Sequence, residues 1–264
     1  MKIMIDAHTH LENGPLSVEY CMKFVNAAVE KGMDTIHILD HTHRFLEFAP
    51  MYEPLKKADY RQKEWFDKKK LEPLQNYFDL IEDMKKELAK RNLPIEVKFG
   101  LEVCYAPENE EFLRDLLSQY PYDYLIGSIH SIDSLLYDMN DFSREILWDK
   151  YDTDAIYKRY YEIMEQMIKS DLFTQIGHPD QLKLFHYEPS YDLVPTYQRI
   201  AKLAKEHDVY MENNTGIHYR YHHEDMGTNP TFLRILKENG VKIITASDAH
   251  QSEHVGMFIK EISE

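Results

Sequence analysis

Cysteine is scarce in this chain, and long apolar runs are missing. Among 264 residues there are two cysteines, Cys21 and Cys104, too few for a disulfide framework. No run of about 18 apolar residues occurs, which excludes a typical membrane-spanning helix. One aspartate and two histidines interrupt the first ten residues, MKIMIDAHTH, too early for a signal peptide. These absences predict a cytoplasmic protein without a membrane partner.

Basic residues are also in deficit. The chain has 31 lysines and arginines against 46 aspartates and glutamates, giving a formal net charge of −15. Such a surface repels the backbone of nucleic acids, so we expect no nucleic-acid partner. The excess of acid is compatible with holding multivalent cations, and 14 histidines are many for this length. Oligomeric state is not indicated.

Short apolar segments alternate with amphipathic helical patterns along the chain. The expected strands are residues 2–8, 34–40, 95–103, 122–129, 173–178, 208–214 and 241–247. The expected helices are residues 17–32, 74–92, 154–170, 196–207 and 229–240. Repeated strand–helix units predict an α/β protein with parallel strands and right-handed crossovers. No glycine-rich dinucleotide motif or P-loop follows a strand, which favours a TIM-like (β/α)7 barrel over an open sheet.

No internal repeat or low-complexity tract divides the chain, so we expect a single domain over residues 1–264. Two connections, near 42–72 and 131–153, are long and rich in aromatic and charged residues. Both follow strand ends, where substrate lids are commonly built. We therefore expect two lid-like insertions.

Metal-capable side chains recur where the predicted strands end. These residues are His8, His10, His41, Glu102, His130, His178, Asp248 and His250. Any one of the histidines taken alone is more simply a core or surface residue. Together they indicate a shared site, because the carboxyl ends of parallel barrel strands meet at one mouth. Imidazoles and carboxylates suit zinc, manganese or ferrous iron, and eight ligands require two or three ions. Strand alternation also places Asp6 on the face of His8, one step deeper.

These residues lie in motifs that resemble the polymerase and histidinol phosphatase (PHP) family. The motifs are HTH at 8–10, LDH at 39–41, GLEV at 100–103, GSIHS at 127–131, IGHPD at 176–180 and SDAH at 247–250. They follow the family's order over nearly the whole chain. GLEV, GSIHS, IGHPD and the segment MENNTG resemble the stand-alone histidinol-phosphate phosphatases in particular.

The resemblance implies a distorted barrel with a trinuclear site, with zinc favoured over manganese or ferrous iron. One ion would take His8, His10, Glu102 and Asp248. A second would take Glu102, His130 and His178. The third would take His41, His250 and one residue shortly after the HTH motif. Here the segment LENGPL departs from the family pattern, and the candidates for the missing ligand are Glu12, Asp40 and His43.

The activity implied by the resemblance is metal-dependent hydrolysis of L-histidinol phosphate to L-histidinol and phosphate, a step of histidine biosynthesis. The absence of a serine, cysteine or aspartyl nucleophile motif agrees with metal-assisted hydrolysis. Glu102 and Asp248 are the expected catalytic residues. A phosphate monoester also needs cationic or hydrogen-bonding partners, and the candidates are His43, Arg44, Arg159, His218 and Arg220.

Three alternatives compete with this interpretation. The same site could act on nucleotides or other small phosphate esters. A barrel deaminase or amidase usually bridges its ions with a modified lysine on the fourth strand, and the segment YDYLIGSIH has no lysine. A catalytically dead interaction module would have lost its ligands, whereas this chain keeps eight candidates.

Overall fold

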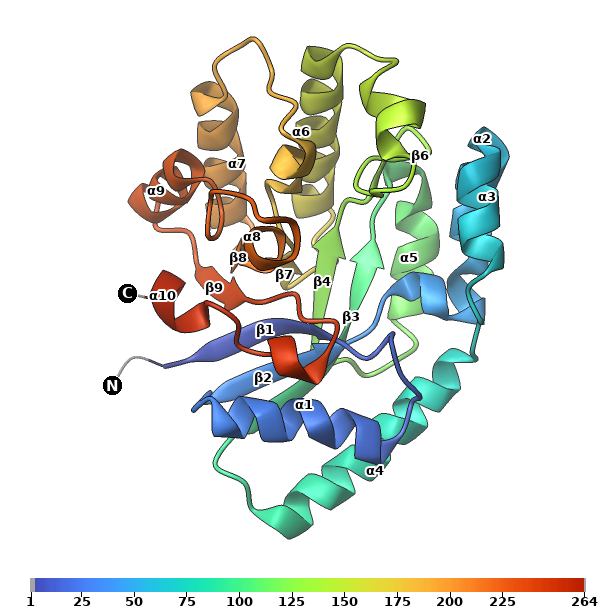
Figure 1. The fold of residues 1–264 in the computed structure, drawn as a ribbon, viewed down its shortest axis with the longest axis vertical. Coiled ribbons are helices and arrows are strands. Elements are labelled where there is room, and N and C mark those ends of the chain that lie inside the picture. The colour runs from blue at the N-terminus through green and yellow to red at the C-terminus, as the bar shows by residue number, and fades with distance from the viewer. Residues whose placement is uncertain (1–2, 264) are drawn as a thin grey trace.

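The computed structural model describes residues 3–263, and its strands form a curled parallel sheet (Figure 1). The seven strands are β1 (Ile5–His10), β2 (Thr35–Leu39), β3 (Glu96–Cys104), β4 (Tyr124–Ser128), β7 (Gln175–Ile176), β8 (Tyr210–Asn214) and β9 (Ile243–Ala246). They are hydrogen-bonded in this order, each parallel to the next. The predicted α/β fold with seven parallel strands is confirmed. Lys2, the first residue of the first predicted strand, lies outside the described residues.

The sheet closes into a barrel where β9 returns beside β1. Thr9 and Ala249 form a parallel bridge, and the His10 amide donates to the Ala249 carbonyl over 2.7 Å. The β1 register shifts between Asp6 and Thr9. Simple alternation therefore fails for Asp6, whose buried carboxylate accepts hydrogen bonds from Ser247 and Gly256 instead of joining the histidines. The barrel is distorted at this seam.

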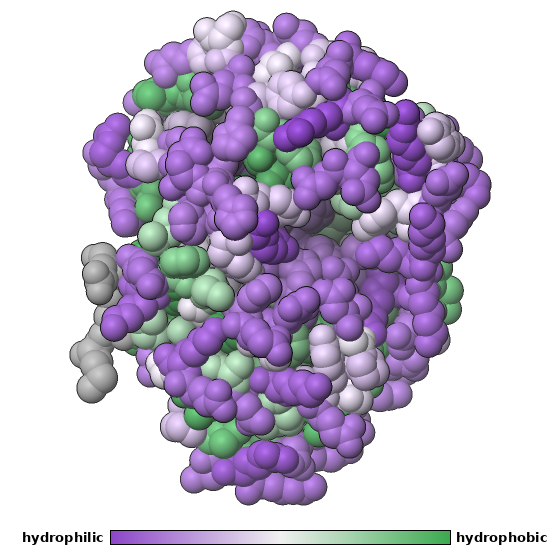
Figure 2. Space-filling view, viewed as in Figure 1, coloured by the Kyte–Doolittle hydropathy of each residue, from purple (hydrophilic) through white to green (hydrophobic). Residues whose placement is uncertain are grey.

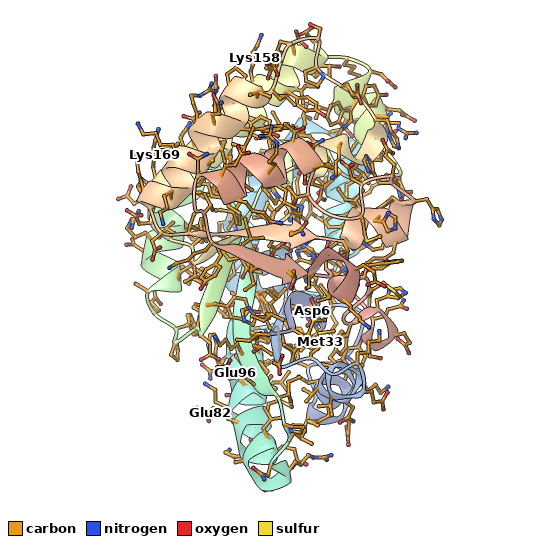
Figure 3. All side chains as sticks on the ribbon, turned by 90° about the vertical axis from the view of Figure 1, so that its left-hand side faces the viewer. Asp6, Met33, Glu82, Glu96, Lys158 and Lys169 are labelled. Carbon is orange, nitrogen blue, oxygen red and sulfur yellow. The ribbon has the colours of Figure 1, made fainter. Side chains whose placement is uncertain are left out.

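The expected helices are all present and cover the outside of the barrel (Figure 1). They are α1 (Val18–Glu30), α4 (Leu74–Arg91), α6 (Thr153–Lys169), α7 (Val194–Glu206) and α9 (Pro230–Glu238). Side-chain caps at Ser17 and Asp152 satisfy free amides in the first turns of α1 and α6. Lys158 and Lys169 of α6 project outward, while the opposite face of this helix is buried (Figure 3).

Five short helices are not predicted by the sequence patterns. They are α2 (Glu53–Ala58), α3 (Tyr60–Asp67), α5 (Glu110–Leu117), α8 (Gly216–Tyr221) and α10 (Ile259–Ser263). Helices of this length are marginal on their own and depend on tertiary packing. Their local sequences therefore carry too little periodicity to reveal them.

The core is divided between the two faces of the sheet. Ile36 and Ile38 of β2 belong to the large apolar cluster that includes the helices, whereas Leu39, Tyr124 and Ile126 form a small separate cluster. Side chains of a strand alternate between its faces, so Leu39 points to the inner face while its neighbour Ile38 points outward. This small cluster fills part of the barrel interior.

The two long connections contact each other through Gln62 of α3. The first contains α2 and α3; the second contains the hairpin of β5 (Ser131–Ile132) and β6 (Leu135–Leu136). The buried Gln62 amide donates to the Leu55 and Ser134 carbonyls over 2.6 and 3.0 Å. Its oxygen accepts from the Leu136 amide over 2.6 Å. One side chain therefore joins both segments.

The face seen in Figure 2 is covered mainly by hydrophilic residues, in agreement with the large net charge. Within residues 3–263, no helix has both the length and the apolar composition needed to cross a membrane.

Candidate metal centre

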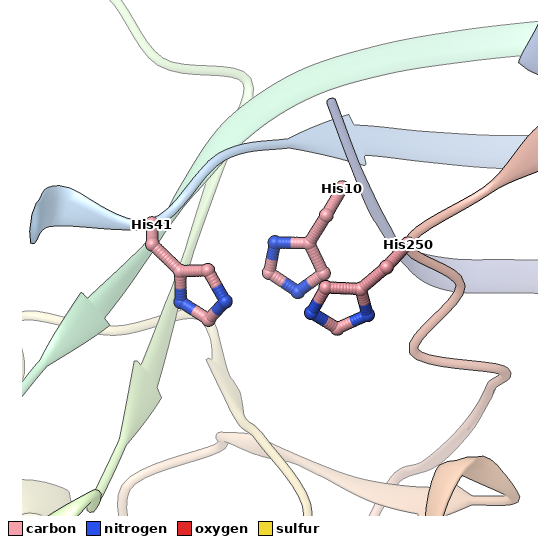
Figure 4. A group of neighbouring side chains, drawn as sticks. All are labelled: His10, His41 and His250. Carbon is pink, nitrogen blue, oxygen red and sulfur yellow. The ribbon is translucent and has the colours of Figure 1, made fainter. Parts of the chain in front are cut away.

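The eight predicted metal-capable residues meet at one end of the barrel. His8 and His10 end β1, Glu102 lies near the end of β3, and the others follow β2, β4, β7 and β9. Figure 4 shows the imidazoles of His10, His41 and His250 converging from three segments. The ring centre of His10 lies 4.1 Å from that of His41 and 4.2 Å from that of His250.

Four of these side chains bring donor atoms close together. Glu102 Oε2 lies 3.6 Å from His8 Nε2 and 3.5 Å from His10 Nε2. Asp248 Oδ1 lies 3.7 and 3.2 Å from the same two nitrogens. A tetrahedral zinc ion, with bonds of roughly 2.0–2.2 Å, separates its ligand atoms by roughly 3.3–3.6 Å. These four distances lie close to that range, so the four side chains are candidates to hold one ion.

The other oxygen of Glu102 faces a second pair of histidines. Glu102 Oε1 lies 3.1 Å from His130 Nε2 and 2.8 Å from His178 Nε2. One carboxylate thus presents one oxygen to each of two nitrogen sets. This is the arrangement of a ligand that bridges two cations.

A third group gathers around Glu12. Its Oε1 lies 3.4 Å from His250 Nε2, and its Oε2 lies 3.4 Å from His43 Nε2. Burial opposes ionisation of Glu12, but nearby imidazoles, led by that of His41, hold its pKa below the ordinary value. Asp40, another candidate for the missing ligand, is instead hydrogen-bonded to Arg44 over 2.6 Å and to the His41 amide over 2.9 Å.

The donor atoms fit cations because several of them lack any other partner. Within the described residues, His8 Nε2 and His10 Nε2 are buried without a hydrogen bond, and Glu102 Oε2 lies 2.6 Å from His41 Nδ1. Buried polar atoms are normally satisfied, so neighbouring unsatisfied donor atoms indicate a site for an ion. Burial opposes ionisation of Glu102, but surrounding histidines keep its pKa well below the usual range. Burial also opposes ionisation of Asp248, but the Arg220 guanidinium keeps the pKa of that carboxyl well below its usual range.

Further carboxylates orient the histidines. Glu212 of β8 contacts His8 Nδ1 over 2.8 Å and accepts hydrogen bonds from Gln175 and the His178 amide. Asp138 contacts His130 Nδ1 over 2.7 Å. Such partners fix the ring orientation and the tautomer that leaves Nε2 free for a metal. The sequence patterns did not identify them, because Glu212 lies within β8 and not after its end, and Asp138 lies in a long connection.

We expect Glu212→Gln to weaken the centre without destroying it. The amide retains the shape of the side chain but loses the charge that holds the His8 Nδ1 proton. Partners of this kind typically contribute about 10–100-fold to metal affinity or activity. Zinc affinity measured by chelator competition should fall by that factor, whereas the exposed control Glu206→Gln on α7 should not change it. Unchanged zinc affinity in Glu212→Gln would contradict the orienting role.

Two of the grouped residues have strained backbones. His178 has a φ of 28° and Asp248 has a φ of 55°. Positive φ is uncommon for residues other than glycine and costs of order 1–3 kcal/mol at each position. Such strain concentrates at functional sites, where the surrounding structure holds it in place.

A cavity of about 270 Å³ opens above the histidines. Of the five predicted substrate-binding residues, His43 and Arg220 line it. Arg44 does not, because its guanidinium is hydrogen-bonded to Asp40, Glu72 and two backbone carbonyls. Arg159 pairs with Asp133 and Glu162 elsewhere on the surface. His218 contacts the His223 carbonyl and is also absent from the lining.

The cavity wall includes residues that were not expected from the sequence. Trp65 and Lys69 come from the first long connection, and the Lys69 ammonium lies 4.3 Å from the Trp65 ring centre. Asp138 and Met139 come from the second connection, and Tyr221 ends α8. Their position at the mouth depends on how the two connections fold back, which local patterns do not predict.

The chain is similar to proteins that are named histidinol phosphatases, both in sequence and in structure. A probable histidinol-phosphatase from Deinococcus radiodurans is 28% identical over 257 residues, covering 96% of this chain and 88% of the relative. A solved structure from Listeria monocytogenes has a TM-score of 0.79 at 20% identity, covering 97% of this chain and 99% of the other. The structure of histidinol phosphate phosphatase from Lactococcus lactis, complexed with zinc, L-histidinol and phosphate, has a TM-score of 0.67 at 18% identity, with coverages of 98% and 93%.

The solved structures show that the barrel fold is shared. The model of the PHP domain matches residues 6–216, a range that contains six of the eight grouped residues. The other two, Asp248 and His250, complete the same cluster in space. The chain therefore belongs to the PHP domain family.

Proposed function

We propose that this protein hydrolyses L-histidinol phosphate to L-histidinol and inorganic phosphate, with bound divalent cations. The observation that carries the proposal is the group of buried nitrogen and carboxylate donors, shared through Glu102, at the floor of a cavity. The substrate is supported by the relatives, since the Deinococcus radiodurans protein, which matches 96% of this chain, is named a probable histidinol-phosphatase.

We propose three cation sites, with zinc preferred. The first comprises His8, His10, Glu102 and Asp248; the second comprises Glu102, His130 and His178; the third comprises His41, His250 and Glu12. Bound divalent cations lower the pKa of water and neutralise charge on phosphoryl oxygens. Glu12 supplies the third carboxylate in place of the ligand that the family pattern leads one to expect.

The protein's own residues would orient the phosphate and manage protons. Arg220 Nη1 lies 2.8 Å from His250 Nδ1, and Nη2 pairs with the Asp248 carboxylate. Its guanidinium is held at the cavity wall, where a phosphate would meet a fixed positive charge. Because Arg220 keeps the pKa of Asp248 low, Asp248 stays ionised and serves as a ligand or proton acceptor, not as a proton donor.

The two connections near 42–72 and 131–153 would act as lids that select the organic part of the substrate. Asp138 is an acidic neighbour suited to the substrate ammonium, and Trp65 offers a flat apolar surface for the imidazole. Lys69 adds a second cation near the mouth, suited to the phosphate. We propose this division of roles from the chemistry of the cavity lining.

Kinetics with defined metals test the proposed substrate. Metal-free protein reconstituted with zinc or manganese should show a kcat/KM for L-histidinol phosphate at least about 100-fold above that for nucleoside monophosphates, since unpaired buried polar groups penalise the wrong substrate. Glycerol phosphate serves as the control for nonspecific phosphatase activity. Equal or faster turnover of nucleotides would contradict the histidinol assignment and favour the nucleotide alternative.

A further inference from the structure

A second cavity, of about 510 Å³, lies at the end of the barrel opposite the metal centre. The first residue of every barrel strand, from Ile5 of β1 to Ile243 of β9, lines it. Glu96, labelled in Figure 3, is the first residue of β3. The proposed phosphatase activity does not use this cavity, because its residues lie at the amino ends of the strands and the metal-capable residues lie at the carboxyl ends.

Two buried polar side chains in this cavity have unsatisfied atoms. His37 and Tyr124 each expose only 5% of their surface, and their ring centres lie 4.3 Å apart. Within residues 3–263, His37 Nδ1 and the Tyr124 hydroxyl have no hydrogen-bond partner. An unsatisfied buried group is costly, and two side by side at the wall of a cavity indicate a missing hydrogen-bonding ligand.

The remaining lining provides both signs of charge and an apolar wall. Lys98 and Lys237 are matched by Glu96 and Asp123, so the cavity favours neither an anion nor a cation. The isoleucines at positions 5, 243, 244 and 262 supply the apolar part. A small molecule that carries an ammonium, a carboxylate and an apolar part complements the acidic, the basic and the apolar residues of this lining.

The cavity is also connected to the metal centre. Gln175 lines it and donates from Nε2 to Glu212 Oε1 over 2.6 Å. The same oxygen contacts His8 Nδ1 over 2.8 Å. A ligand that contacts Gln175 is therefore separated from a metal-binding imidazole by two hydrogen bonds inside the barrel.

We propose that this cavity binds a free α-amino acid, and that the Gln175–Glu212–His8 hydrogen bonds couple its occupancy to the metal centre. The ammonium and carboxylate would pair with the charged rim residues. The side chain would reach His37 and Tyr124. The inference concerns binding and does not depend on the identity of the phosphate ester.

Binding can be measured directly by titrating the metal-loaded protein with each of the twenty L-amino acids in a calorimeter. We expect at least one to bind with a one-to-one stoichiometry, and to remain bound when inorganic phosphate saturates the catalytic mouth. If none binds, or if phosphate displaces the amino acid, the proposed site is wrong. No phosphatase assay enters this test, so its failure is separate from failure of the proposed function.

Two variants locate the binding site. His37→Leu removes the hydrogen-bonding ring, and Lys98→Glu reverses a charge on a partly exposed side chain without disturbing the barrel interior. Each should weaken binding about fivefold to tenfold, the usual effect of one hydrogen bond or ion pair. The matched control Lys158→Glu reverses an exposed charge on α6, outside this cavity, and should not change affinity. Wild-type affinity in both cavity variants would overturn the assignment.

The coupling has its own measurement. The amino-acid affinity of the metal-loaded protein is compared with that of protein stripped by chelator and then dialysed. Linked sites change each other's affinity by the same factor, and a coupling of ordinary size is about fivefold or more. Equal affinities in the two forms would overturn the coupling.

Discussion

Glu102→Gln is expected to abolish turnover, with a loss of at least about 10³-fold in kcat/KM. The two oxygens of Glu102 face different nitrogen sets, at 2.6–3.6 Å on one side and 2.8–3.1 Å on the other. An amide keeps the size of the side chain but cannot share a negative charge between two cations. The first and second sites should therefore lose affinity together.

Elemental analysis and kinetics on the same preparation check this expectation. Glu108→Gln makes the same chemical change six positions later, at an exposed residue, and should retain wild-type metal content and rate. Thermal unfolding of the two variants after chelator treatment separates a folding defect from a metal defect. Full metal content and near-normal turnover in Glu102→Gln would show that the carboxylate is not the bridge.

Removal of the metal is expected to have an equally large effect on activity, and also to destabilise the fold. With the cations removed, the proposed reaction loses its main means of neutralising phosphoryl charge. The buried atoms His8 Nε2 and His10 Nε2 would also lose the partner that burial requires. Ligand binding at a thousandfold excess over Kd stabilises a protein by about 4 kcal/mol, so the metal-free form should unfold at a markedly lower temperature.

Dialysis against a chelator, followed by readdition of zinc or manganese, provides the measurement. Activity should disappear and return, and the unfolding temperature should follow it. The chelator saturated in advance with metal is the control for direct inhibition. Persistent activity in protein shown by elemental analysis to be metal-free would rule out the proposed chemistry.

The strands and the cluster at their ends could be predicted from sequence because parallel barrels obey simple rules. Six of the seven apolar runs end at or beside a histidine or carboxylate, and parallel strand ends meet at one mouth. His8, Glu102 and His178 therefore come together although nothing local connects them. By contrast, Asp6 was misplaced, because alternation cannot anticipate the register shift in β1.

The organic side of the cavity was harder to anticipate. Arg44 resembles a phosphate ligand in sequence, but its guanidinium is taken up by Asp40 and Glu72. Lys69 and Asp138, which do line the cavity, lie within long connections whose sequences show no regular hydrophobic periodicity. Which side chains of such connections face the mouth is decided by contacts between them, such as those of Gln62.

The seam between β1 and β9 has a consequence for biosynthesis. The first proposed ion joins His8 and His10 to Asp248, so its ligands leave the ribosome at widely separated times. A nascent chain cannot assemble this coordination sphere until residue 248 has left the exit tunnel. The proposed ion can therefore be acquired in full only after both segments have been synthesised, and the histidines of β1 must stay free of competing metals until then.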